Sequence, residues 1–357
     1  MPPIRVLVVE DSPTQRYQLV SLIQQAPDMV VIGQARDGLE AIQLVEKLRP
    51  DVISMDLRMP NLSGLDATRH IMDVHPTPIV IVSSASSDAD LTMQAMQAGA
   101  LAALEKPPAV DHPDFKARCA ELLSALRLMS GVRVIRHWQS VPAGGMLPAL
   151  RPTGPLLAPV MPNTTTPEVV AIGASAGGPS ALAELFGRLP YDFNLPIVAV
   201  QHLTADFMPG LAEWLDRVCA LPVRLAQNGE KLTPGVALLA PGDQHLRIGA
   251  DRRIVLDSER GSYRHQPAVD VLLTSVAQRF GANAVGILLT GMGDDGASGL
   301  KAMRDSGART IAQDESSCVV FGMPGAAIAL DAAEFILPLD KIASAIFKLS
   351  QRGEDRK

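Results

Sequence analysis

The sequence contains few cysteines and lacks membrane or secretion signals. Of its 357 residues only Cys119, Cys219 and Cys318 are cysteines, too widely spaced for a metal-binding pattern. Such sparse use favours a reducing compartment, and we interpret the three thiols as small buried hydrophobic groups. No run approaches the roughly 18 apolar residues that a spanning helix needs, and the first residues do not resemble a secretory signal. We therefore expect a cytoplasmic protein without membrane insertion.

A stripe of basic residues is also absent. The net charge is −6, and the first 126 residues carry 10 basic and 16 acidic residues. Residues 169–357 are closer to balance, with 18 basic and 21 acidic residues. Nucleic-acid-binding domains usually concentrate lysine and arginine on one face, and many add a DNA-reading helix pair. We therefore expect no nucleic-acid partner.

The first half alternates apolar strand-like runs with amphipathic helix-like stretches. Continuous apolar strands separated by helices predict a parallel sheet that is covered on both faces. Five such units in the first 126 residues fit a doubly wound domain of flavodoxin-like size. The expected strands are Ile4–Val9, Met29–Ala35, Val52–Met55, Ile79–Val82 and Leu101–Leu104. The expected helices lie near Thr14–Gln25, Gly38–Leu48, Leu65–Val74, Ala89–Ala98 and Asp114–Leu128.

A proline-rich segment separates this domain from a second α/β region. Seven prolines between positions 142 and 167 argue against regular structure there and predict a linker. We expect a first domain over 1–126, a linker over 127–167 and a second domain over 168–357. The second domain is predicted to be another parallel sheet, with a β-hairpin formed by Leu246–Ile248 and Arg253–Leu256.

Acidic residues, one serine and one lysine follow the predicted strands of the first domain. They are Glu10, Asp11, Asp56, Ser83 and Lys106. Because the carboxyl ends of parallel strands share one edge, we expect these groups to converge. Clustered carboxylates repel one another unless a cation lies among them, and Mg²⁺ prefers oxygen ligands. This pattern suits phosphoryl transfer to Asp56, with Lys106 and Ser83 contacting the phosphoryl oxygens.

The first half resembles the receiver domain of response regulators. The strings that carry the resemblance are Val9–Ser12, Met55–Pro60 with Gly64, Val82–Ser84 and Glu105–Pro107. It implies phosphorylation at Asp56 and a Mg²⁺ site formed by Glu10, Asp11, Asp56 and Arg58. Ala103 departs from the pattern, since receivers often carry an aromatic residue three positions before the lysine.

The second half contains a serine in a glycine-rich turn. Residues 173–179 read Gly-Ala-Ser-Ala-Gly-Gly-Pro, which matches the nucleophile-elbow pattern Gly-x-Ser-x-Gly around Ser175. A helix that begins here would offer free backbone amides to a developing oxyanion. Such a turn can also bind phosphate or simply cap a helix, so the pattern alone does not decide between these uses.

A nucleophilic serine requires a base and an acid that orients the base. His202 is the best candidate for the base because it ends the next predicted strand, while His245 and His265 compete with it. Asp294 and Asp295 follow the strand at 284–289, and only one of them can readily point at His202. The order serine, histidine, aspartate differs from that of the α/β-hydrolases.

The whole chain apart from the linker resembles the chemotaxis protein-glutamate methylesterases. The strings that carry the resemblance are Gly173–Pro179, Gln201-His202, Ala240–Gly242, Arg264–Asp270, Thr290–Gly299 and Ser317–Pro324. It implies Ser175 as nucleophile, His202 as base, Asp295 as orienting acid and the backbone amide of Met292 near the oxyanion. Asp294 stands where the family often has asparagine, and Ala176 where it sometimes has threonine.

The resemblance also implies a function. We expect hydrolysis of glutamate methyl esters on the cytoplasmic helices of chemoreceptors, without a cofactor for the ester chemistry, together with deamidation of receptor glutamines. A chemotaxis histidine kinase is the expected phosphodonor, and we expect the unphosphorylated receiver to cover the mouth of the active site. Two alternatives remain: the same enzyme in a non-motility chemosensory array, or a catalytically silent adaptor that binds receptors.

Overall fold

The computed structural model describes residues 2–83, 89–132, 134, 165–259, 261 and 263–351. The chain divides into two compact units, residues 1–143 and 144–357. Ser84 and most of the expected linker lie outside the described residues, so the domain boundaries stay a prediction. The boundary expected at residue 126 falls inside a helix that continues to Met129. None of the helices in the described part of the chain combines the length and hydrophobicity required to cross a membrane.

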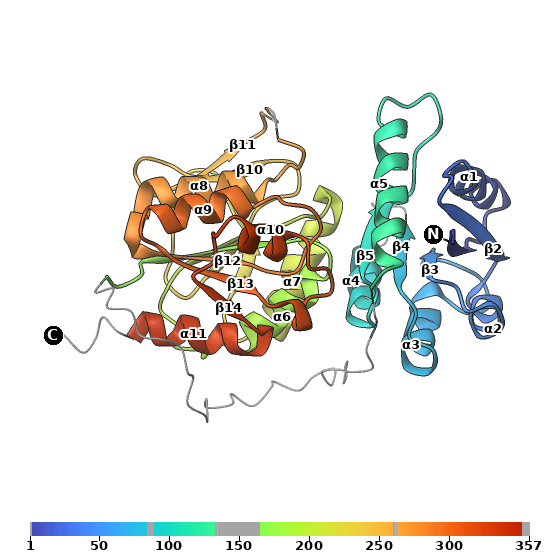
Figure 1. The fold of residues 1–357 in the computed structure, drawn as a ribbon, viewed down its shortest axis with the longest axis horizontal. Coiled ribbons are helices and arrows are strands. Elements are labelled where there is room, and N and C mark those ends of the chain that lie inside the picture. Colours follow the sequence, from blue (N-terminus) through green and yellow to red (C-terminus); the bar gives the residue numbers. More distant parts are fainter. Residues whose placement is uncertain are drawn as a thin grey trace. The chain divides into compact units, whose positions relative to one another are not determined.

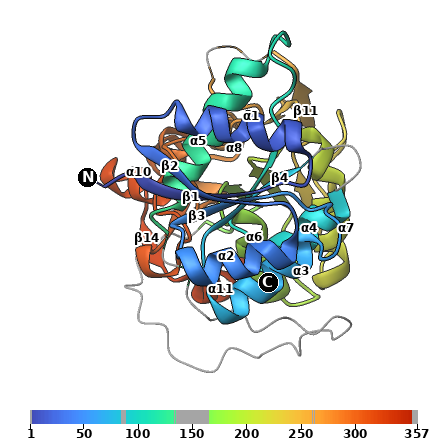
Figure 2. The ribbon, with the colours of Figure 1, turned by 90° about the vertical axis from the view of Figure 1, so that its right-hand side faces the viewer.

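The first unit is a parallel five-stranded sheet in the order β2-β1-β3-β4-β5. This is the flavodoxin-like order, and it confirms the expected fold class. Figure 2 shows α1 and α5 on one face of the sheet and α2, α3 and α4 on the other. The strands are β1 (Ile4–Val9), β2 (Met29–Ala35), β3 (Val52–Met55), β4 (Ile79–Ser83) and β5 (Ala102–Glu105). The helices are α1 (Pro13–Gln24), α2 (Gly38–Leu48), α3 (Gly64–Val74), α4 (Ala89–Gln97) and α5 (Phe115–Met129).

The second unit is a parallel seven-stranded sheet in the order β14-β13-β12-β6-β7-β9-β8. The strands are β6 (Val169–Ala174), β7 (Ile197–Gln201), β8 (Val223–Leu225), β9 (Ala237–Leu239), β12 (Ala284–Leu288), β13 (Arg309–Gln313) and β14 (Phe335–Leu337). The central strands β6, β7 and β12 are buried along their whole length, because helices cover both faces of the sheet.

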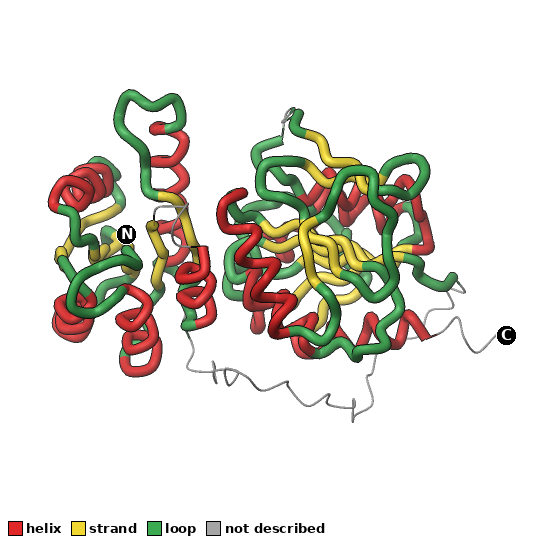
Figure 3. Tube along the Cα trace, turned by 180° about the vertical axis from the view of Figure 1, so that it is seen from behind, coloured by secondary structure: helices red, strands yellow, loops and turns green. Residues whose placement is uncertain are grey.

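Helices α8 and α9 pack together on one face of this sheet, and α6 and α11 lie on the other (Figure 1). The helices are α6 (Gly178–Gly187), α7 (Met208–Val218), α8 (Val269–Phe280), α9 (Ala297–Asp305), α10 (Met323–Ala329) and α11 (Leu339–Gln351). Among the described residues, the short 3-10 helices are η2 (Ala205–Phe207), η3 (Gly281–Asn283) and η4 (Glu315–Ser317). Figure 3 shows the same arrangement from behind, with helices on both sides of the strands.

The predicted hairpin is present as a separate two-stranded sheet. Strands β10 (His245–Ile248) and β11 (Ile254–Asp257) are antiparallel, and β10 packs against α8. Sequence reasoning did not anticipate β8, β14, α10 or α11. These elements complete the edges of the sheet and its covering layers, since α10 packs against α9 and α11 against α6, without changing the predicted architecture.

Candidate active site and phosphorylation site

Ser175 and His202 lie at the same edge of the large sheet. Ser175 follows β6 and His202 follows β7, and these two strands pair in parallel. The N–H of His202 donates to the carbonyl of Ala174 at 3.0 Å, and the N–H of Ser175 donates to the carbonyl of Thr290 at 3.0 Å. Backbone pairing therefore extends one residue past the strands and brings the loop that follows β12 to the same edge.

Asp295 is the acid that contacts His202. His202 Nε2 lies 2.8 Å from Asp295 Oδ2, which also accepts from the N–H of Val269 at 2.8 Å. The other oxygen, Oδ1, accepts from the N–H of Asp270 at 3.0 Å. Both N–H groups belong to the first turn of α8, where backbone amides have no acceptor within the helix. The first turn of α8 thus holds the carboxylate of Asp295 in place, and this carboxylate orients the ring of His202.

The pKa of the Asp295 carboxyl shows the effect of these contacts. Burial by itself would raise this pKa. The hydrogen bond and charge of His202, together with the backbone amides of Asp270 and Val269, outweigh burial and hold the pKa below its ordinary value. Asp295 is therefore ionised at neutral pH, as an acid that orients a histidine must be.

The bond to Asp295 also defines the proton on His202. Because a carboxylate only accepts hydrogen bonds, Nε2 carries the proton and Nδ1 carries the free electron pair. Nδ1 is buried and has no hydrogen-bond partner among the described residues. No hydrogen bond joins Ser175 Oγ to His202 within that part of the chain. Nδ1 is thus the nitrogen that is available to accept the serine proton.

Thr290 ties the loop after β12 to two distant segments. Its Oγ1 donates to the carbonyl of Ala176 at 2.9 Å and accepts from the N–H of Val320 at 2.9 Å. Its N–H donates to Gln313 Oε1 at 2.8 Å. The threonine hydroxyl therefore joins the turn around Ser175 to the segment that precedes α10.

Gly291 and Met292 lie beside the nucleophile. A Cβ on Gly291 would stand 2.8 Å from the Cβ of Ser175 and would collide with Met323 Sδ, so only glycine fits. The carbonyl of Gly291 accepts from the N–H groups of Gly322 and Met323, which holds the loop in place. The N–H of Met292 donates to no acceptor among the described residues. It is therefore available to a developing oxyanion, which is the role that the family resemblance implies and which stays a prediction.

The other candidate residues have different contacts. His245 is fully buried, and its Nδ1 accepts from the N–H of Ala268 at 3.1 Å, which ties it to the start of α8. The ring of His265 stacks on the ring of His202, with centroids 4.2 Å apart and an interplanar angle of 17°. Asp294 is exposed, and its carboxylate bonds to none of the described residues. Sequence reasoning foresaw neither the stack nor the amides that hold Asp295.

The carboxylates of the first unit converge as predicted. Glu10, Asp11 and Asp56 each offer an oxygen within 4.8 Å of the others. The N–H of Asp56 donates to the carbonyl of Val9 at 2.9 Å, which extends the pairing of β1 and β3. A Cβ on Gly64 would collide with the carbonyl oxygen of Asp56, so this glycine permits the loop after β3 to close.

Lys106 lies among these carboxylates. Its Nζ donates to Asp56 Oδ2 at 2.8 Å and lies 2.9 Å from Glu10 Oε2. Its N–H donates to the carbonyl of Ser83, a fully buried residue at the end of β4. The N–H of Arg58 lies 3.4 Å from Asp56 Oδ1. Because a guanidinium cannot coordinate a cation, only the main-chain carbonyl of Arg58 could serve as a ligand.

The carboxylates of this site outnumber the ammonium group of Lys106, so a divalent cation could balance the remaining negative charge. Burial raises the pKa of both Glu10 and Asp56, although bonds to Lys106 oppose the change. Burial by itself would lower the pKa of Lys106, but the hydrogen bond to Asp56 and the close negative charge of Glu10 outweigh this and leave the pKa raised. Glu10 Oε2 is buried and receives no aligned hydrogen bond from the described residues. These oxygen donors fit the ligand preference of Mg²⁺.

Comparisons with known proteins identify the families that the two halves of the chain match. The CheB methylesterase family matches residues 170–346, and the response regulator receiver domain matches residues 6–115. The protein-glutamate methylesterase/protein-glutamine glutaminase 1 of Syntrophus aciditrophicus is 44% identical over 350 residues, which cover 97% of this chain and 98% of that protein. The corresponding protein of Nitrosospira multiformis is 42% identical over 356 residues, which cover 99% of each chain.

A solved structure supports the fold of the second unit. The crystal structure of the Thermotoga maritima CheB methylesterase catalytic domain is 37% identical, with a TM-score of 0.50. The match covers 52% of this chain and 100% of that domain. These comparisons confirm the resemblance that the motifs indicated. With both matches in order along nearly its full length, the chain belongs to the family of protein-glutamate methylesterases/protein-glutamine glutaminases.

Proposed function

We propose that this chain hydrolyses the γ-methyl esters of glutamate residues on the cytoplasmic helices of chemoreceptors. The observation that carries the proposal is the contact of Asp295 with His202, at the sheet edge where Ser175 follows the neighbouring strand. Acyl transfer of this kind requires an ionised aspartate, largely shielded from solvent, that holds a histidine beside a serine. The names of the relatives supply the substrate class.

The proposed reaction passes through an acyl-enzyme. Ser175 Oγ attacks the ester carbonyl while His202 Nδ1 takes its proton, and Asp295 stabilises the imidazolium that forms. The N–H of Met292 donates to the oxyanion, a contribution of about 3 kcal/mol in comparable sites. The C–O bond to methanol then breaks as His202 returns the proton to the departing oxygen. Water cleaves the acyl-enzyme by the same steps and restores the free serine and a glutamate carboxylate.

The same residues would support deamidation of a receptor glutamine. His202 must then give its proton to the amide nitrogen of the tetrahedral intermediate, so that the C–N bond breaks and ammonia leaves. The relatives carry glutaminase in their printed names, which supports this second activity.

The proposed control of the enzyme is phosphorylation of Asp56 by a chemotaxis histidine kinase. Glu10, Asp11, Asp56 and the carbonyl of Arg58 would hold Mg²⁺, which when bound supplies positive charge to the phosphoryl oxygens. Lys106 contributes a fixed ammonium group, and Ser83 lies at the end of the neighbouring strand. That the unphosphorylated receiver restrains the esterase stays a prediction.

The first experiment is methanol release from methylated chemoreceptor membranes. Release that requires Ser175, with Ser175→Ala as control, would support the esterase. An increase with a small phosphodonor and Mg²⁺ that disappears in Asp56→Ala would support the switch. If Asp56→Ala leaves basal and stimulated rates unchanged, the switch is wrong and the esterase stands.

Two alternatives give different results in this assay. An adaptor that only binds receptors would release no methanol from any methylated receptor. An esterase of a non-motility chemosensory array would act on receptors of that array and leave motility receptors methylated. The intact set of Ser175, His202 and Asp295 favours an active enzyme over the adaptor.

A further inference from the structure

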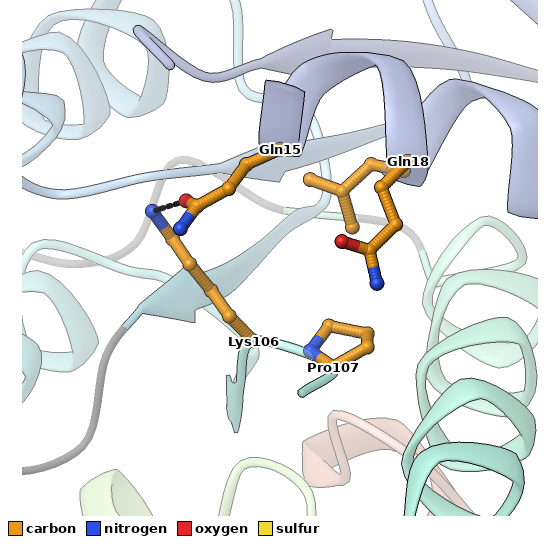
Figure 4. Close-up of a pocket in the computed structure, with 5 residues that line it drawn as sticks. Gln15, Gln18, Lys106 and Pro107 are labelled. Atoms are coloured by element: carbon orange, nitrogen blue, oxygen red, sulfur yellow. Dashed lines mark hydrogen bonds between the residues drawn. The ribbon is translucent and has the colours of Figure 1, made fainter. Parts of the chain in front are cut away.

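The ammonium group of Lys106 has a neutral partner besides its two carboxylates. Nζ donates to Gln15 Oε1 at 2.8 Å, the same distance as its bond to Asp56 Oδ2. Glu10 Oε2 lies at 2.9 Å without an aligned hydrogen bond. Figure 4 shows the Gln15 amide reaching from α1 to the end of the Lys106 side chain. Gln15 is exposed, whereas only 15% of the Lys106 side chain is exposed.

The local sequence around Gln15 suggests a different use for its side chain. Ser12 to Gln15 matches the capping-box pattern Ser-x-x-Gln, in which the glutamine side chain binds the N–H of the capping serine. Only half of this motif forms, since the N–H of Gln15 donates to Ser12 Oγ at 3.5 Å. The N–H of Ser12 instead donates to Glu10 Oε1 at 3.2 Å. The carboxylate thus replaces the glutamine at the cap, and the Gln15 oxygen is left for Lys106.

We infer that Gln15 is a positioning residue for Lys106 during phosphoryl transfer, an inference that rests on the proposed phosphorylation of Asp56. The oxygens of Asp56 and Glu10 must change partners when a phosphoryl group and a divalent cation enter the site. The Gln15 amide is neutral and lies outside the group of carboxylates that could hold the cation. It therefore keeps the ammonium group in place while its charged partners rearrange.

The kinetic test compares two glutamines of the same helix. Gln15→Met removes the acceptor oxygen and keeps the length of the side chain. Gln18→Met is the matched control, because Gln18 lies on the next turn of α1 (Figure 4). Its side chain donates to the carbonyl of Pro108 at 3.1 Å and not to Lys106. The full chain is incubated with Mg²⁺ and radiolabelled acetyl phosphate, and the rate of label incorporation is measured.

We expect Gln15→Met to take up label about fivefold more slowly, as suits the loss of one exposed hydrogen bond to a charged group. Gln18→Met should keep the wild-type rate, and both variants should keep the melting temperature of the receiver. Equal rates in Gln15→Met and wild type would overturn the inference. Equal losses in both variants would assign the effect to α1 as a whole and overturn it as well.

A second measurement does not depend on phosphorylation. In protein with ¹⁵N-labelled lysine, an ammonium group held by aligned hydrogen bonds gives a slowly exchanging NMR signal, which Lys106→Arg identifies by its disappearance. Gln15→Met should broaden this signal and Gln18→Met should not, whereas an unchanged signal in Gln15→Met would overturn the inference. If the wild type takes up no label but the signal depends on Gln15, the proposed phosphorylation fails and the positioning of Lys106 stands.

Discussion

Asp56 and Asp295 each follow a central strand of a parallel sheet, and 4% and 11% of their side chains are exposed. Their pKa values nevertheless shift in opposite directions, since that of Asp56 is raised and that of Asp295 is lowered. Burial alone would raise both pKa values, and the difference comes from the groups that oppose this effect. Asp295 receives two backbone N–H groups of α8 and the ring of His202. Asp56 shares one ammonium group with a second buried carboxylate.

This difference follows the two proposed roles. An acid that orients a histidine remains ionised throughout the reaction, so permanent donors suit it. A phosphoryl acceptor must exchange its partners for a cation and a phosphoryl group, so fixed donors on every oxygen would oppose the reaction. The aspartate that is proposed to position a histidine is therefore held by fixed donors, whereas the aspartate that is proposed to react has partners that can be exchanged.

The largest expected effect comes from Asp295→Asn. The amide cannot accept from all three donors, and His202 loses its charged partner, so the esterase rate should fall on the order of 10³-fold to 10⁴-fold. Initial rates of methanol release measure the loss. Asp294→Asn is the matched control because Asp294 is exposed, and it should stay within about twofold of wild type. Equal losses in both variants would show that the orienting acid has been misassigned.

A smaller effect is expected from His265→Ala. The stacked ring of His265 limits the movement of the His202 ring, so its removal should lower kcat about tenfold with little change in KM. His265→Phe keeps an aromatic face and should recover most of the rate. If Phe and Ala reduce kcat equally, the imidazole rather than the stack is what His202 requires.

The two aspartates should also differ in how pH changes stability. The pKa of Asp295 is lower in the folded state, so its contribution is fully present above its unfolded pKa, about 4, and is lost as pH falls through the folded pKa. The urea midpoint of the esterase unit should therefore fall less on acidification in Asp295→Asn than in wild type. If the urea midpoints of the wild type and the variant fell in parallel between pH 6 and pH 3, the lowered pKa of Asp295 would be contradicted.

The smallest expected effect concerns Asp56→Asn. Because burial raises the pKa of Asp56, the ionised form is disfavoured by folding at neutral pH. Without a divalent cation, the variant should raise the free energy of unfolding of the receiver by about 1 kcal/mol. Added Mg²⁺ should stabilise the wild type more than the variant in thermal unfolding. A variant that is less stable and still responds fully to Mg²⁺ would remove the contrast between the two aspartates.

Most of the fold could be predicted because its central strands are continuous apolar runs. The unanticipated β8 and β14 are three residues long and only partly buried, so their composition resembles that of loops. Helix α10 begins with Met323-Pro324-Gly325, which reads as a turn although proline is tolerated in the first turn of a helix. Helix α11 did carry a signal, since Leu339, Ile342, Ala343 and Ile346 recur at helical spacing and are buried.

The sequence predicts the site residues that follow strands, but not the contacts that depend on packing between distant segments. Residues that follow strands meet at one edge, which accounts for Ser175, His202 and Asp56. The donors to Asp295 come from α8, 25 and 26 residues earlier, and their arrival depends on packing. The contact of Gln15 with Lys106 spans 91 residues, and it exists because Glu10 takes the N–H that a capping box would assign to Gln15.

The hydrogen bonds of the Thr290 hydroxyl make the site around Ser175 depend on a part of the chain that is synthesised late. This hydroxyl joins the turn at Ala176 to Val320, 114 and 30 residues away from it, so the pocket around Ser175 requires a segment that the ribosome adds late. Domains generally fold as units while the chain emerges from its N-terminal end. The receiver can therefore complete its own site long before the esterase can. The nascent chain would complete its receiver first and the pocket around Ser175 last.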